Sequence, residues 1–253
     1  MKRLFGVFVF AFVTLLFSTP VQALEFGVRG YYWFPGFKGD LKASGGILEG
    51  TEVNVKDDLA LGYKAYPAVE AFAGLGKQHV SLTYMEANYT AGTFLPKAVN
   101  FHGVNFPKGT AVDTGLRIRI LDLAYQYDLI NRENILAGFS LGVIGKIKYL
   151  EGEASMTSGA LKAEQTVHLP IPMVGLGAHI GLLANILEAR AQLTGISYSN
   201  NYLYEAAADL SLTPFPLIDL HGGYKIIKLH VDAQDIYLNS EFSGPYLAIT
   251  VGF

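Results

Sequence analysis

The chain has 253 residues, a length that suits one domain or at most two. Only 16% of the residues are charged and the formal net charge is −3, which excludes the strongly basic surface that nucleic-acid-binding proteins need. The sequence contains no cysteine, which excludes disulfides, thiolate metal sites, a cysteine nucleophile and a lipid-anchored cysteine.

The first 23 residues have the organisation of a secretory signal peptide. Lys2 and Arg3 provide a charged start, and an apolar run follows at 4–17. That run is shorter than the roughly 20 residues of a membrane-spanning helix. Val21-Gln22-Ala23 offers small residues suited to cleavage after Ala23. We therefore expect residues 1–23 to be a cleaved signal peptide and residues 24–253 to form the mature domain.

The mature chain alternates apolar and polar residues with a period of two, which is typical of β-strands with one apolar face. In the last segment, Leu247, Ile249, Val251 and Phe253 share one face, while smaller and more polar residues share the other. Ten segments show this pattern. We expect strands at 24–34, 65–74, 78–91, 111–128, 134–150, 166–183, 187–198, 202–213, 217–231 and 244–253.

The segments that connect these strands favour a membrane barrel. Short turns follow the second, fourth, sixth and eighth strands, whereas long loops are expected at 35–64, 92–110, 151–165 and 232–243. Short turns on one side and long loops on the other are typical of outer-membrane barrels. A soluble β-sandwich or lipocalin-like barrel would show the same alternation. Aromatic residues near the strand ends, like the girdles of membrane barrels, favour the membrane.

We predict an all-β fold, a transmembrane antiparallel up-and-down β-barrel of about ten strands, with eight or twelve also possible because strand boundaries are uncertain. Both termini are expected in the periplasm. The alternation changes phase at two places, between Ile120 and Leu121 and between Ile226 and Ile227. A β-bulge at each place would explain the change, and so would a wrong strand assignment.

The segment 244–253 resembles the C-terminal strand of bacterial outer-membrane proteins, in which a terminal aromatic residue follows alternating apolar residues. The matching assembly-signal positions are Tyr246, Leu247, Ile249, Val251 and Phe253. The segment 53–62 is similar to a loop of uncharacterised proteobacterial outer-membrane barrel proteins, a resemblance that brings no known activity. The resemblance implies location in the Gram-negative outer membrane, with the barrel-assembly machinery, membrane lipid and lipopolysaccharide as partners.

Charged residues of both signs fall on the face expected to point into the barrel. They are Glu25, Arg29, Glu70, Arg117, Arg119, Asp122, Lys146, Glu188, Arg190 and Asp209. Because buried charges must be paired or hydrated, these near-balanced signs indicate pairing between neighbouring strands. A barrel of about eight strands is filled by its side chains, and ten is close to that limit. We predict a packed, salt-bridged lumen, and a narrow pore remains the alternative.

Some outer-membrane barrels are hydrolases, in which a histidine paired with an acidic residue or a serine can act as a catalytic group. Asp219 and His221 resemble the Asp/His pair of the ten-stranded omptin proteases, but they lie near a short turn, whereas the omptin site lies at the extracellular mouth. His230 and Asp232 are nearer that mouth, and Asp57-Asp58 in the first long loop offers a second acidic pair. An omptin-like enzyme requires these groups to converge at the outer mouth.

His79 and Ser81 share one strand face and resemble the His/Ser pair of outer-membrane lipid A deacylases, but they also lie near a short turn. His102, His168 and His179 are scattered, and no metal site is expected. We therefore predict a monomeric, non-enzymatic outer-membrane barrel with a structural or surface-loop role or a narrow pore, with no cofactor and no nucleic-acid partner. The alternative is an outer-membrane hydrolase, either omptin-like or lipid A-modifying.

Overall fold

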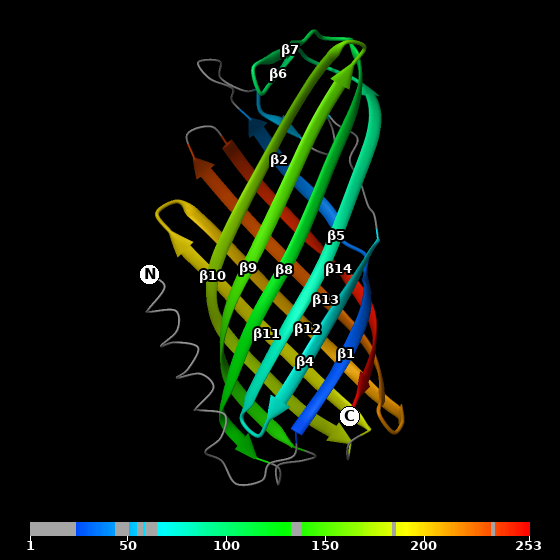
Figure 1. The fold of residues 1–253 in the computed structure, drawn as a ribbon, viewed down its shortest axis with the longest axis vertical. Coiled ribbons are helices and arrows are strands. Elements are labelled where there is room, and N and C mark those ends of the chain that lie inside the picture. The colour runs from blue at the N-terminus through cyan, green and yellow to red at the C-terminus, as the bar shows by residue number, and fades with distance from the viewer. Residues whose placement is uncertain are drawn as a thin grey trace, which may run out of the picture.

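A computed structural model describes residues 24–43, 51–54, 58, 65–132, 138–183, 186–233 and 236–253. The proposed signal peptide and Asp57 lie outside these residues. Twelve antiparallel strands form one sheet, and ten of them close into a barrel because β1 (Leu24–Trp33) pairs with β14 (Ile236–Gly252) (Figure 1). Within the described ranges, no helix is long and apolar enough to cross a membrane.

The ten predicted strands are confirmed, and each corresponds to one barrel strand. Between β1 and β14 these are β4 (Tyr66–Leu75), β5 (Gln78–Phe94), β8 (Ala111–Arg132), β9 (Phe139–Ser158), β10 (Leu161–Leu183), β11 (Leu187–Tyr198), β12 (Asn201–Phe215) and β13 (Ile218–Ala233). Barrel strands that follow one another along the chain are hydrogen-bonded neighbours in the sheet. The fold is thus the predicted antiparallel up-and-down barrel.

A break at Phe34 and Pro35 divides what is otherwise one long strand. β1 pairs with β14 up to Trp33, and β2 (Gly36–Ala43) continues along the same neighbour, with β3 (Val53–Asn54) at its outer edge. Pro35 has no N–H to donate, so it suits this interruption. A Cβ atom at Gly244 would collide with the Phe34 carbonyl oxygen, so only glycine allows the two backbones to approach here.

Two of the expected long loops are mostly strand. β9 and β10 stay paired up to Ser158 and Leu161, where Gly159 adopts a φ of 57° in a tight turn. β13 and β14 likewise pair as far as Ala233 and Ile236. The segment 92–110 carries a small hairpin of β6 (Val99–Phe101) and β7 (Val104–Phe106). The expected boundaries were wrong because polar sequence marks contact with water rather than the end of the sheet.

The barrel has two halves with opposite polarity. In the half that holds both described chain ends, outward side chains are apolar and exposed, as at Leu123 (49%) and Leu193 (56%). In the other half the apolar side chains point inward and are buried, as at Ile120 (7%), Ile227 (4%) and Leu229 (5%). A continuous exposed apolar belt suits contact with lipid, whereas a buried apolar interior with a polar exterior suits water.

This reversal accounts for both phase changes, and the expected bulges were wrong. Pairing runs without interruption through Ile120 and Leu121 and through Ile226 and Ile227. Register shifts occur instead at 128–130, 181–183 and 212–215, close to the short-turn end. The phase changes therefore mark the level at which the strands leave the apolar belt. Because short turns face the periplasm in outer-membrane barrels, we assign the reversed half to the extracellular side.

Candidate functional site

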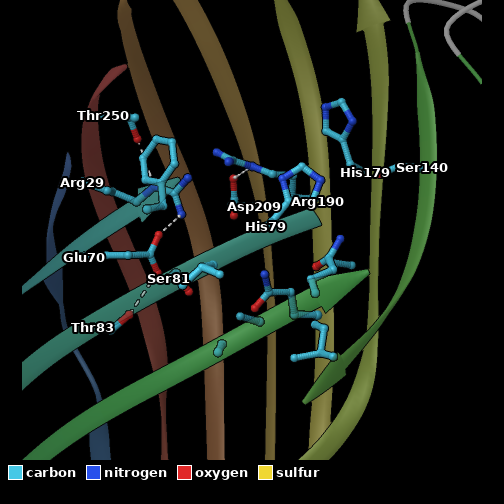
Figure 2. A pocket seen from close by; sticks show the side chains of 18 of the residues that line it. Arg29, Glu70, His79, Ser81, Thr83, Ser140, His179, Arg190, Asp209 and Thr250 are labelled. Carbon is cyan, nitrogen blue, oxygen red and sulfur yellow. Dashed lines mark hydrogen bonds and ion pairs between the residues drawn. The ribbon is translucent and has the colours of Figure 1, made fainter. Parts of the chain in front are cut away.

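A polar cavity of about 610 Å³ occupies the periplasmic half of the barrel (Figure 2). Eight of the ten charged residues expected to face the lumen line this cavity. They are Glu25, Arg29, Glu70, Asp122, Lys146, Glu188, Arg190 and Asp209. Their strands place them inward because the alternation in this half puts the apolar set toward the lipid belt.

Arg117 and Arg119 are the two exceptions, and their predicted position in the lumen is corrected by the structure. Both side chains project from the outer surface of β8, with 43% and 39% of their area exposed. Arg119 pairs with Glu151 at 2.6 Å and with Glu86 at 3.6 Å. They lie beyond the polarity reversal, where the inward face of β8 has become apolar.

Glu86 anchors this outer group of charges. Asn88 and Tyr84 donate hydrogen bonds to its carboxylate at 3.0 and 2.8 Å. These bonds, followed by the nearby arginines Arg119 and Arg117, hold the pKa of Glu86 below its usual value. The carboxylate is therefore charged at neutral pH, and the group forms a mixed-charge patch on the water-exposed wall.

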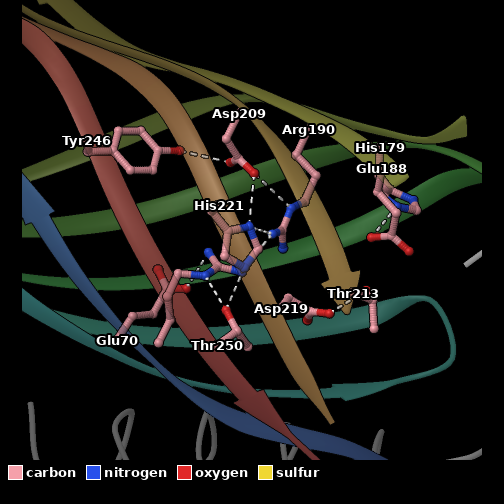
Figure 3. Close-up of polar contacts among 11 residues, drawn as sticks. Glu70, His179, Glu188, Arg190, Asp209, Thr213, Asp219, His221, Tyr246 and Thr250 are labelled. Carbon is pink, nitrogen blue, oxygen red and sulfur yellow. Dashed lines mark hydrogen bonds and ion pairs between the residues drawn. The ribbon is translucent and has the colours of Figure 1, made fainter. Parts of the chain in front are cut away.

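A buried polar network lies deep in the periplasmic cavity (Figure 3). The His221 ring contacts Arg190 at 2.6 Å, Asp209 at 3.2 Å and Thr250 at 2.8 Å. The Tyr246 hydroxyl donates to the second oxygen of Asp209 at 2.8 Å. Five side chains from neighbouring strands thus pair with one another, as buried polar groups require, although Arg190 Nε lies 3.4 Å from Asp209 and has no hydrogen-bond partner among the described residues.

Arg29 links this network to the other side of β1. Its guanidinium donates to Thr250 at 2.9 Å and to Glu70 at 3.0 Å, and Thr83 donates to the other Glu70 oxygen at 3.1 Å. Figure 2 shows the same pairs from within the cavity. The charges predicted to pair across neighbouring strands do so here.

Two further histidines face carboxylates in the cavity wall. His79 Nε2 lies 3.2 Å from Asp128, and His179 Nε2 lies 3.1 Å from Glu188. Ser81 also lines the cavity, but among the described residues no hydrogen bond joins it to His79. His79 is therefore paired with an acid rather than with a serine.

A layer of five charged side chains crosses the barrel above the cavity. Lys148 on β9 donates to Asp122 on β8 at 2.6 Å and reaches Glu205 on β12 at 3.1 Å. Lys146 and Lys225 approach Glu205 at 3.2 and 2.7 Å. Because β10 and β11 separate β9 from β12 in the wall, the contacts between Lys148 and Glu205 cross the lumen.

Sequence reasoning missed Glu205 as the centre of this layer. The alternation on β12 already places it on the inward face, between the outward-facing Tyr204 and Ala206. Its three lysine partners, however, come from β9 and β13, so only the closed barrel brings them together. The sequence likewise indicates His221 only as a catalytic candidate. It does not predict that His221 joins Arg190 and Asp209 to Thr250 in the polar network.

An apolar core fills the barrel on the extracellular side of the charged layer. Trp33 lies at the boundary, with 1% of its area exposed and its ring 5.6 Å from Lys225 Nζ. Beyond it, Phe37 stacks on Phe242 and contacts Tyr89, with ring centroids 4.3 and 5.5 Å apart. The polar cavity therefore ends at a charged layer that is itself covered by packed side chains.

No protein-family model matches the chain, and no curated protein matches it. Among solved structures, the outer membrane protease OmpT of Escherichia coli aligns with a TM-score of 0.57 at 9% identity, covering 93% of this chain and 99% of that chain. The translocator domain of the autotransporter NalP of Neisseria meningitidis aligns at 0.46 and 10%, covering 99% and 95%. Ail of Yersinia pestis aligns at 0.35 and 10%, covering 92% and 100%.

The chain has the fold of outer-membrane β-barrel proteins. At such low identity the likeness extends to the fold and to nothing finer. In this outer-membrane barrel, the described residues contain no group of three or more His, Asp and Glu side chains that could hold a metal ion.

The proposed assembly-signal residues of the outer-membrane barrel divide between its two faces. Leu247, Ile249, Val251 and Phe253 lie on the exposed outer face, with 63, 54, 40 and 60% of their area accessible. Tyr246 points inward, to Asp209. The Phe253 ring stacks on Phe26 at 5.6 Å, and the two backbones exchange hydrogen bonds where the barrel closes.

Proposed function

We propose that this protein is a non-enzymatic, non-conducting outer-membrane barrel that carries a rigid β-sheet extension outside the membrane as a binding surface. The observation that carries the proposal is the charged layer formed by Asp122, Lys146, Lys148, Glu205 and Lys225. Lys148 is completely buried within it. A transmembrane pore would have to pass both this layer and the apolar core beyond it.

Each of these barriers opposes ion flow for its own reason. An ion that crosses the layer must displace lysine–carboxylate contacts of 2.6–3.2 Å that are shielded from water. The apolar core offers an ion few polar ligands, and apolar constrictions exclude ions because they exclude water. The two barriers in series favour the packed lumen over the narrow pore.

The extracellular extension supplies a surface suited to binding. β8, β9 and β10 rise beyond the apolar belt, and Figure 1 shows them as the tallest part of the molecule, next to the β6–β7 hairpin. Their outer face carries paired charges such as Arg119 with Glu151, and their packed interior keeps this face rigid. Binding residues are often carried at the exposed ends of a rigid scaffold.

Planar-bilayer recordings of the refolded mature barrel test the proposal. Samples are first checked for the heat-modifiable band of a folded barrel, and insertion is verified by protection from protease in vesicles. We expect no discrete conductance steps from the folded protein. A porin inserted in the same membrane serves as the positive control. Reproducible steps from folded protein would overturn the proposal in favour of a pore lined by the cavity charges.

An outer-membrane hydrolase is the second candidate, and the observation in its favour is the set of histidine–carboxylate pairs at the periplasmic cavity. The omptin-like arrangement expected at the outer mouth lacks support. His230 stacks on Tyr202 and meets Tyr237 edge to face, and among the described residues no carboxylate lies within ion-pair distance of it. Asp58 pairs with Lys97 at 3.0 Å. Peptide or lipid A hydrolysis by the folded barrel that is lost in His79→Ala would support the hydrolase.

A further inference from the structure

We propose that the extracellular half of the barrel contains a binding site for a small, neutral aromatic molecule with one hydroxyl group. The site is an internal cavity of about 180 Å³ inside the apolar core. Trp33 borders it at the charged layer and Phe101 of the β6–β7 hairpin borders it as well. It is separate from the polar cavity, because the charged layer lies between them.

The lining of this cavity selects for an apolar ligand. Aromatic and aliphatic side chains from nine strands and the hairpin face it, including Phe37, Met85, Ile118, Leu150, Ile227 and Leu229. Protein interiors are normally close-packed, so an unfilled space of this size is destabilising. An apolar cavity of roughly 150 Å³ stays dry and accepts benzene, which sets the scale of the ligand.

Buried polar atoms of the lining define the hydroxyl, because the Tyr66 and Ser240 hydroxyls both lack a hydrogen-bond partner among the described residues. Ser240 lines the cavity from β14, only 5% of it is exposed, and its Oγ has no hydrogen-bond partner among the described residues. A buried hydroxyl without a partner is costly and rare. A ligand hydroxyl that meets Ser240 would satisfy it, whereas a charged ligand would lose its hydration without gaining a partner.

A gap in the barrel wall gives access to the site. β10 pairs with β11 only between Val174 and Leu183, so among the described residues Leu161–Met173 has no partner strand on that side. Pro170 and Pro172 lie in this stretch and have no N–H to pair a further strand. The inward-facing side chains Val167 and Leu169 line the cavity and remain partly exposed.

The single tryptophan of the chain reports occupancy directly. Trp33 borders both this cavity and the polar cavity and is sealed from bulk solvent and lipid, so the variants that fill the apolar cavity show which of the two the quencher occupies. The full mature barrel is reconstituted in lipid vesicles and titrated with 4-bromophenol, a heavy-atom quencher that is uncharged at neutral pH because phenols titrate near pH 10. We expect saturable quenching of Trp33 fluorescence. Bromobenzene, which lacks the hydroxyl, should bind about threefold to tenfold more weakly.

Four variants make the assignment specific. Ser240→Ala should lower the affinity for 4-bromophenol to that for bromobenzene and leave bromobenzene binding unchanged, while Ser211→Ala, a buried serine of the periplasmic half, should change neither. Ala87→Phe, or Ala154→Leu if the first variant fails to fold, fills the cavity and should abolish saturable quenching. The proposal is overturned if folded wild-type barrel shows no saturable quenching, or if the filled variants are quenched as strongly as the wild type.

Discussion

The Glu205 carboxylate on β12 forms an ion pair with Lys225 Nζ on β13 at 2.7 Å. Both side chains lie inside the barrel and are almost fully shielded from water. Two more lysines from β9 approach the same carboxylate. One acidic residue therefore balances cations from both sides of the lumen. Its removal should have a far larger effect than removal of an exposed acid that has one partner.

Glu205→Gln should destabilise the barrel by about 3–5 kcal/mol, because among the described residues Asp122 would be the one remaining ion-pair partner of Lys146 and Lys148, and Lys225 would have none. The measurement is urea unfolding of the protein refolded into lipid vesicles. Glu164→Gln is the matched control, since Glu164 is 48% exposed and pairs with Lys162 alone. The control should cost about 0–1 kcal/mol. Equal stabilities of the two variants would contradict a structural role for the charged layer.

The absence of cysteine allows the corrected position of Arg119 to be tested by labelling. Arg119→Cys should react with a membrane-impermeant maleimide on intact cells, because this position faces outward in the extracellular half. Gln126→Cys, on the same strand but in the periplasmic cavity, should react only after the outer membrane is permeabilised. The wild type gives the background. The reverse labelling pattern would show that the barrel has the opposite orientation.

Separate variants can distinguish the proposed assembly signal at Phe253 from its stacking contact with Phe26. If the terminal aromatic residue is an assembly signal, Phe253→Ala should reduce the amount of heat-modifiable barrel in the outer membrane several-fold. Phe26→Ala removes the stacking partner of Phe253 but keeps the terminal aromatic residue. We expect near-normal assembly of this control. Equal loss in both variants would indicate that barrel closure, rather than the signal, requires Phe253.

The sequence predicts the strands well because period-two alternation is a direct consequence of pleating. Only in the membrane half does it predict correctly whether a charged side chain points into or out of the barrel. Alternation reports which residues share a face but not which face is inside, and the inside of this barrel changes from polar to apolar along β8. Arg117 and Arg119 were assigned to the lumen for this reason, although they share a face with the lipid-exposed Leu123.

The charged layer illustrates a second limit, since it depends on contacts across the lumen. Pairs on adjacent strands, such as Arg29 with Glu70, follow from the order of strands in an up-and-down barrel. Lys148 and Glu205 are separated by two intervening strands, and their meeting depends on barrel diameter and strand stagger. Neither quantity can be read from a single sequence.

The polarity reversal itself can be tested on one face of one strand. Leu82 and Thr90 both point outward from β5 and are exposed, but Leu82 lies in the apolar belt and Thr90 lies beyond it. Leu82→Arg should cost about 2–4 kcal/mol, because it places a charge against lipid. Thr90→Arg should change the stability by no more than about 0.5 kcal/mol, as is usual at a water-exposed site. Urea unfolding in vesicles measures both, and similar costs would mean that the belt extends to Thr90 or does not contain Leu82.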